Sequence, residues 1–143
     1  MNTATLDRLL TVHEATRLLR SVPTGRLLYT EDALPAVRPV TFTAPRGEVL
    51  IPTGPDPWFD RFDGTFLAFE AGELDVPSGT GWTVLVLGHA RRSASGDPAG
   101  NGAAPTAPRP HENGHSHLVL DIERVTGRRI TLAPGTVCES TMR

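Results

Sequence analysis

The stretch 81–92 reads GWTVLVLGHARR, and it constrains the fold more than any other part of the chain. Residues 84–87 are a continuous apolar run, which in a strand indicates burial on both faces. Gly88 interrupts the strand, and a glycine inside a strand is typical of a bulge or bend that curves a sheet towards a barrel. This segment therefore predicts a β-rich fold built around one long strand.

Shorter apolar segments lie on both sides of this strand, separated by turns of about four residues, as is usual in antiparallel sheets. The expected strands are residues 26–30, 35–43, 48–53, 65–71, 117–122 and 128–132. The pattern favours a mainly β, six- to seven-stranded antiparallel barrel, and a β-sandwich is the alternative.

One helix is expected near the N-terminus. Thr11 and Glu14 have the spacing of a capping box, and the helix should lie within residues 5–21, before Pro23 and Gly25. The leucines between residues 6 and 10 are expected to form a short preceding turn or an earlier start of this helix.

The chain has 143 residues, which fits one domain over 1–143, with residues 93–116 expected to form a flexible polar loop. A net charge of −2 argues against a partner that is a nucleic acid or a membrane surface. We expect a cytoplasmic protein, because Cys138 is the single cysteine and the sequence shows no signal peptide and no membrane-spanning apolar run.

Arg38 is the first candidate site residue. It would share one strand face with Ala36, Val40 and Phe42, and Pro39 follows it directly. The simpler interpretation is that its head reaches water or a carboxylate while its stem packs. The functional interpretation is that the guanidinium binds a phosphate or carboxylate, and that Pro39 marks an edge or an interruption of pairing.

Three further features have a simple and a functional interpretation. Thr53 begins an ordinary turn or helps to cradle a phosphate. Trp82 and Thr83 either cover the end of the barrel or flank a flat ligand. The histidines His111, His115 and His117 resemble a metal-binding tract, but a zinc site needs three or four fixed ligands, so we expect no metal site.

Taken in order, several segments resemble the pyridoxamine 5′-phosphate oxidase-like proteins, which are split β-barrels that typically bind FMN. The segments are VPTGRLLYT, LPAVRPVTF, EVLIPT, FLAFEAGELD, GTGWTVLVLGHARR and LDIERVTGRRI, and they span most of residues 8–132. The resemblance implies a split barrel with an N-terminal helix, a homodimer with the cofactor cleft at its interface, and a small-molecule substrate.

The resemblance also implies which residues contact the cofactor. Arg38 would reach the phosphate, and the strand around it would face the flavin ring. The implied contacts are Arg38, Pro39, Val40, Thr41, Thr43, Thr53, Trp82 and Thr83. No motif places a catalytic acid or base, although His89 and His117 are candidates.

The chain departs from the family pattern where a basic phosphate-binding group is usual. Asp56-Pro57-Trp58 stands there, so Arg38, together with Arg61, would have to bind the phosphate. Two hypotheses follow. One is an FMN-binding oxidoreductase acting on an unknown small molecule. The other is a barrel without flavin that serves as a binding or accessory protein, or that uses haem or a deazaflavin.

Overall fold

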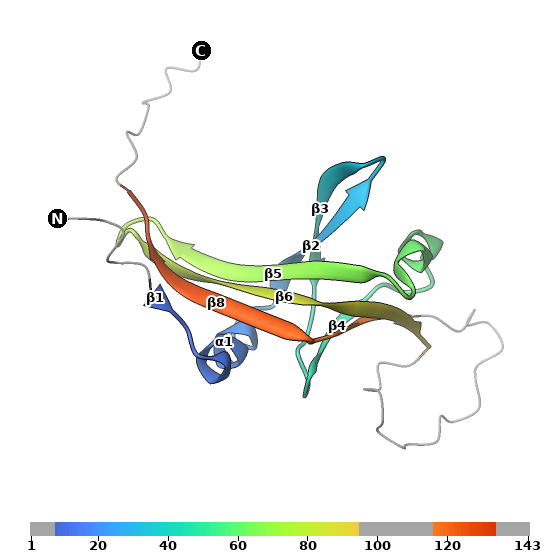
Figure 1. Cartoon of the computed structure of the whole chain (residues 1–143), viewed down its shortest axis with the longest axis horizontal. Coiled ribbons are helices and arrows are strands. Elements are labelled where there is room, and N and C mark those ends of the chain that lie inside the picture. The colour runs from blue at the N-terminus through green and yellow to red at the C-terminus, as the bar shows by residue number, and fades with distance from the viewer. Residues whose placement is uncertain (1–7, 95–115, 134–143) are drawn as a thin grey trace, which may run out of the picture.

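The computed structural model of the protein describes residues 8–94 and 116–133. Within these residues the chain forms eight strands, one α-helix and one 3₁₀ helix (Figure 1). In chain order they are β1 (Arg8–Leu9), α1 (Val12–Leu19), β2 (Thr24–Glu31), β3 (Leu34–Thr41), β4 (Glu48–Pro52), η2 (Pro57–Phe62), β5 (Phe66–Asp75), β6 (Thr80–Ser93), β7 (His117–Asp121) and β8 (Arg124–Thr131).

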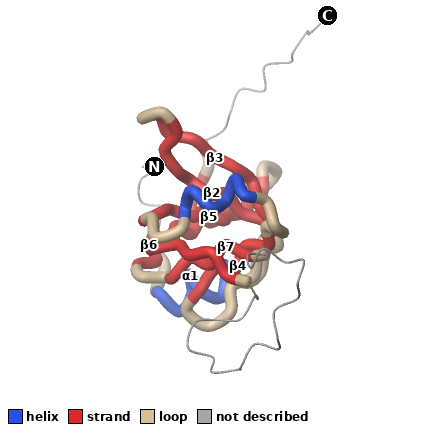
Figure 2. The backbone as a smooth tube through the Cα atoms, turned by 90° about the vertical axis from the view of Figure 1, so that its right-hand side faces the viewer, coloured by secondary structure: helices blue, strands red, loops and turns tan. Residues whose placement is uncertain are grey.

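Six of these strands close into a barrel. Backbone pairing runs from β3 through β2, β5, β6 and β7 to β4, and every pair is antiparallel. A bridge between Thr43 and Leu50 joins the chain after β3 to β4 and completes the circuit. β8 and then β1 extend the sheet from the other half of β6 (Figure 1). Figure 2 shows the six barrel strands from another side, with β3, β2 and β5 above β6, β7 and β4. The barrel is therefore split, which confirms the predicted mainly β class.

β6 carries the division of the barrel. Thr80–Leu87 pairs with β8, whereas Ala90–Ser93 pairs with β7. Gly88 lies between the two parts, and a side chain there would overlap the carbonyl oxygen of Asp121. The glycine expected at a bend thus stands where the strand exchanges one partner for another.

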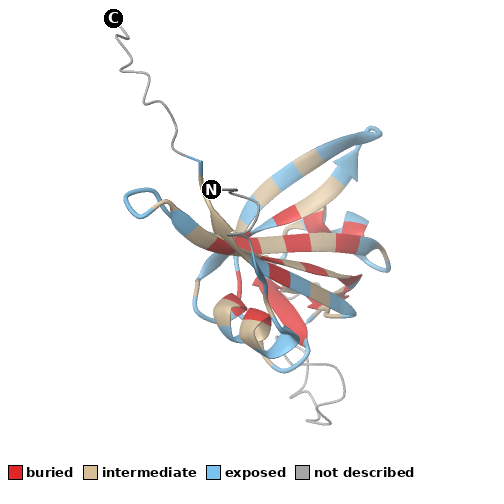
Figure 3. Cartoon of the chain, turned by 60° about the vertical axis from the view of Figure 1, so that its left-hand side comes forward, coloured by how far each residue is buried: buried red, intermediate tan, exposed pale blue. Residues whose placement is uncertain are grey.

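The apolar run of β6 is buried on one face only. Val84 and Val86 are fully buried, while Leu85 and Leu87 on the outer face are half-buried. The expected burial on both faces is therefore incomplete in a single chain. Figure 3 shows this alternation of buried and more exposed residues along the strands.

The helix α1 begins as the sequence predicts. The Glu14 N–H donates to Thr11 Oγ1 at 3.1 Å, and the Thr11 N–H donates to Glu14 Oε1 at 3.0 Å, which completes the capping box. Ala15 and Leu19 are buried where the helix packs on β8 and β6. Leu9 belongs to neither a turn nor the helix but to β1, which pairs with β8 and is the one strand that the sequence did not suggest.

The β2–β3 hairpin projects away from the barrel (Figure 1). Its two turn residues, Asp32 and Ala33, have φ angles of 51° and 63°. This mirror-image turn matches the twist of the paired strands, but the left-handed region is unfavourable for a residue with a Cβ.

None of the described helices is long and apolar enough to span a membrane. The polar stretch expected as a loop, residues 93–116, lies outside the described residues except at its two ends.

Candidate functional site

Arg38 lies on the inner face of β3. Its register partner on β2 is Leu27, and the register partner of Leu27 on β5 is Phe69; both of these residues are fully buried in the core. Its guanidinium lies over the ring of Trp58, 4.4 Å from the centroid, and 4.7 Å from that of Phe59. In the described parts of the chain, no carboxylate lies within ion-pair distance of it. A guanidinium on aromatic faces keeps donors at its edge for an anion, because the rings contact its flat surface.

Trp58 belongs to η2, the short helix formed by the segment Asp56-Pro57-Trp58 and the residues after it. Asp56 caps this helix by accepting the Trp58 N–H at 2.9 Å, and Pro57 occupies the first helical position. Arg61 also lies over Trp58, at 4.7 Å, and its guanidinium donates to Glu31 at 3.1 Å. Arg61 is therefore already paired with a carboxylate, and Arg38 is the better candidate for a phosphate.

Arg92 is an important residue that the sequence analysis missed. Its side chain is only 2% exposed, and Nε donates to Asp60 Oδ1 at 2.9 Å. Its terminal nitrogens donate to the Thr53 hydroxyl at 2.6 Å and to three backbone carbonyls, those of Gly54, Asp56 and His117. This arginine therefore holds the segment between β4 and η2 in place, and its donors are used up by the protein.

Thr53 is a part of this arrangement. Its hydroxyl accepts from Arg92 and donates to the Gly54 carbonyl at 2.8 Å. The Thr53 hydroxyl thus uses both its donor and its acceptor role within the protein, and these two hydrogen bonds fix the conformation of the turn that Thr53 begins. Thr53 would need to change partner to bind a ligand through its side chain.

A cleft of about 320 Å³ lies between the end of β3 and the strands β4 and β7. Thr41 and Thr43 line it together with Phe42, Pro52 and His117. The cleft places two predicted residues beside a histidine that is also a candidate acid or base.

The surroundings of His117 favour its neutral form. Burial, and then the positive charge of Arg92, lower its pKa below the ordinary value of 6.5. Its Nδ1 lies 2.9 Å from Ser116 Oγ. A neutral imidazole can accept or donate a hydrogen bond at a ligand that enters the cleft.

His89, the other candidate acid or base, lies elsewhere. Its Nδ1 is 2.6 Å from Glu123 Oε2, and this exposed pair is held at the surface beside Phe66. The hydrogen bonds from His89 lower the pKa of Glu123. The cleft does not include His89.

Trp82 and Thr83 are near the opposite end of β6 from Arg92. Thr83 Oγ1 donates to Glu70 Oε2 at 2.7 Å, and Glu70 also binds Arg26, on the outer face of the sheet. A hollow of about 390 Å³ adjoins this network. Thr83 lies nine positions before Arg92 on β6, and neither residue lines the cleft at Thr41 and Thr43.

Strand alternation divides the predicted residues further. Val40 and Trp82 face the interior with Arg38, whereas Pro39 and Thr41 face outward with Thr83. One protomer therefore brings Thr41 and Thr43 into one cleft and fixes Arg38 and Thr53 beside η2, whereas Trp82 and Thr83 do not line that cleft.

The described residues contain no group of three or more metal-binding side chains. Of the three histidines considered as a metal tract, His111 and His115 lie outside the described residues.

Comparison with known proteins gives the family. The sequence profile of the pyridoxamine 5′-phosphate oxidase family matches residues 11–129, and the chain belongs to this family. The uncharacterized protein Rv0080 of Mycobacterium tuberculosis is 39% identical over 83 residues, which are 52% of this chain and 53% of that protein. The match thus spans about half of that relative.

Two solved structures share the fold. A FAD-binding protein from Mycobacterium smegmatis has a TM-score of 0.65 and 26% identity, covering 87% of this chain and 98% of its own. A FAD-binding protein from Mesorhizobium loti has a TM-score of 0.63 and 19% identity, covering 88% of this chain and 99% of its own. The resemblance inferred from the sequence is confirmed at the level of family and fold.

Proposed function

We propose that this protein binds a flavin nucleotide and uses it as an oxidoreductase on a small molecule. The observation that carries the proposal is Arg38, a partly buried guanidinium with no carboxylate partner in the described residues, supported from below by two aromatic rings. The family and the FAD bound by the relative from Mycobacterium smegmatis support the same cofactor class.

The residues present fit a flavin phosphate through Arg38. Its guanidinium can donate two parallel hydrogen bonds to phosphate oxygens, which lysine cannot do. Arg92 and Arg61 are engaged with protein groups, and the Asp56 carboxylate caps η2. FMN carries both its phosphate charges on one group, whereas FAD divides them between two, so both nucleotides are to be tested.

The flavin ring would occupy the cleft beside Thr41, Thr43 and His117. When bound, the isoalloxazine supplies the hydride or electron transfer, and the protein supplies position and polarity. The neutral imidazole of His117 would offer a hydrogen bond at the ring or at the substrate.

The cofactor site would be completed by a second copy of the chain. Thr83 does not line the cleft, because β2 and β5 stand between Thr41 on β3 and Thr83 on β6. The outer sheet face is partly apolar, with half-buried Leu28, Leu85 and Leu87 and the exposed Val37. A homodimer that covers this face would bury these side chains and bring the distant parts of the site together.

The experiment is a titration of the purified protein with FMN and with FAD, followed by visible absorbance and flavin fluorescence. We expect binding in the micromolar range or tighter and a dimer by light scattering. Arg38→Ala should weaken binding roughly 10- to 100-fold, the effect of one or two charge-assisted hydrogen bonds.

The matched control is Arg61→Ala, which removes an arginine from the same tryptophan ring but one that is already paired. It should change flavin affinity little. Melting temperatures of both variants show that they are folded. Equal losses in the two variants, or no loss in Arg38→Ala, would contradict the role given to Arg38.

A second candidate function is favoured by Asp56. This carboxylate stands where relatives are expected to place basic groups, and it would repel a phosphate. The alternative is a barrel that has lost flavin and serves as a binding or accessory protein, or that holds haem or a deazaflavin. A colourless protein that leaves FMN and FAD unbound supports this alternative, and haem and deazaflavin titrations then decide between its forms.

A further inference from the structure

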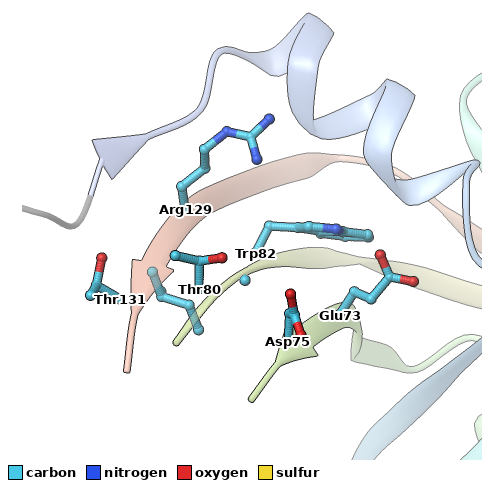
Figure 4. Close-up of a pocket in the computed structure, with 8 residues that line it drawn as sticks. Glu73, Asp75, Thr80, Trp82, Arg129 and Thr131 are labelled. Atoms are coloured by element: carbon cyan, nitrogen blue, oxygen red, sulfur yellow. The ribbon is translucent and has the colours of Figure 1, made fainter. Parts of the chain in front are cut away.

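A second hollow lies at the end of the sheet distant from the cleft, beneath α1 (Figure 4). Its volume is about 330 Å³. This is the lower end of the range for small-molecule pockets. The side chains that define it are Glu73, Asp75, Thr80, Trp82, Arg129 and Thr131.

Strand register builds this hollow. Glu73, Trp82 and Arg129 stand opposite one another in a row across β5, β6 and β8. Asp75, Thr80 and Thr131 form the next row, two residues further along each strand and so on the same face. The sheet pairing thus sets the arrangement of these groups.

Opposite charges lie on the two sides of Trp82. Glu73 and Asp75 come from β5, and Arg129 comes from β8, with β6 between them. Two strand spacings separate these backbones by about 10 Å. Among the described residues no salt bridge joins the carboxylates to Arg129, and Figure 4 shows the arginine rising towards α1 while the carboxylates lie on the other side of the indole.

Glu14 of α1 and Arg8 of β1 form one more charged pair beside Arg129, and Arg8 is the register partner of Arg129. Glu14 lies 3.8 Å from Arg8, and its pKa is lowered mainly by the backbone hydrogen bond from Thr11 and also by the charges of Arg8 and Arg129. Arg129 thus lies near Glu14, but among the described residues no salt bridge joins the two, and Glu14 is bonded to Thr11 and paired with Arg8. The guanidinium of Arg129 can therefore turn to an anion in the hollow.

We propose that this hollow binds a small zwitterion with an ammonium group and a carboxylate group joined by a short apolar spacer. The ammonium would lie against Glu73 and Asp75, and the carboxylate would meet Arg129. The spacer would cross the small part of the Trp82 side chain that is exposed in the hollow. Each charged end meets the opposite charge, and an aromatic face accepts both a methylene chain and a nearby cation. Arg38 and the cleft take no part in this site, whereas Trp82 is also one of the residues implied for the cofactor, so competition with FMN is part of the test.

Three probes of matched length test the proposal: 4-aminobutyrate, butylamine and butyrate. The chain has two tryptophans, so its two indole N–H signals in a nitrogen-15 NMR spectrum can be assigned with Trp58→Phe. We expect 4-aminobutyrate to shift the Trp82 signal with a millimolar Kd and to leave the Trp58 signal unchanged. Butylamine and butyrate should bind at least ten-fold more weakly, since each meets only one end.

Variants separate the two ends of the site. Arg129→Gln should reduce 4-aminobutyrate binding to the level of butylamine, and Glu73→Gln should reduce it towards that of butyrate. Arg46→Gln, which removes an exposed arginine from the turn before β4, is the control and should change nothing. Both site variants alter surface-accessible side chains, and their melting temperatures show whether they are folded.

Three results would overturn the proposal. One is a Trp82 signal that does not respond to 4-aminobutyrate. Another is equal binding of butylamine or butyrate, which would mean that the paired charges are not used. The third is displacement of 4-aminobutyrate by FMN, because the hollow would then belong to the flavin site.

Discussion

Replacing Arg92 with methionine should destabilise the fold strongly. The substitution keeps much of the apolar stem but removes the donors to Asp60, to the Thr53 hydroxyl and to three backbone carbonyls. Removing one member of a buried charged network typically costs about 3–5 kcal/mol, because the groups left behind lose their partners. The Asp60 side chain is 54% exposed and can return to water, which argues for the lower half of this range.

For a domain of this size, a loss of about 3–4 kcal/mol lowers the melting temperature by roughly 10 °C. The measurement is urea unfolding followed by tryptophan fluorescence and circular dichroism, with calorimetry for the melting temperature. Arg92→Lys should lie between the wild type and Arg92→Met, because an ammonium keeps the charge but cannot reach all five acceptors.

The control is Arg61→Met, the same chemical change at an ion pair whose side chains are 42% and 47% exposed. Exposed pairs contribute about 0–1 kcal/mol, so this variant should be nearly as stable as the wild type. The reasoning is refuted if Arg92→Met and Arg61→Met lose the same small amount of stability.

Three further outcomes are expected. Ala33→Gly should raise the free energy of unfolding, measured by urea titration, by about 1 kcal/mol, because Ala33 has a φ of 63° that glycine adopts without strain. An unchanged free energy of unfolding would argue against strain in the turn. Gly88→Ala should destabilise by at least about 3 kcal/mol, or abolish folding, because the new Cβ would overlap the Asp121 carbonyl; a normal melting temperature would contradict the close approach. The pKa of His117 is lower in the folded chain than the ordinary 6.5, so on acidification the unfolded chain takes up a proton first. The stability that neutral His117 contributes is therefore complete above pH 6.5, and it is lost as the pH falls through the lower pKa of the folded chain. His117→Gln should therefore lose less stability on acidification over this interval than the wild type, and parallel pH profiles would count against a buried neutral imidazole.

Features that depend on neighbouring residues could be predicted from the sequence. The capping box at Thr11 and Glu14 and the long apolar strand containing Gly88 are local patterns, and the structure contains both. β1 could not be foreseen, because Arg8 and Leu9 become a strand only through pairing with a segment about 120 residues later.

The predicted site shows the same limit. Arg38 was recognised because a charge on an apolar strand face is unusual in itself. Arg92 carries no such signal, since its partners lie 25 to 39 residues away in sequence and become visible only when β4, η2 and β7 meet. That β2 and β5 stand between Thr41 and Thr83 follows from the strand order, which the sequence does not specify.

The membership of β6 in both halves of the barrel has a consequence for how the molecule opens. Its amides bond to β5 and β8 over one part of its length and to β7 over the other. Because one continuous strand carries the backbone bonds of both halves, opening of one half would distort the strand that holds the other. Slow hydrogen exchange should therefore extend without a break across Gly88, and the two halves should exchange as a single unit rather than in sequence.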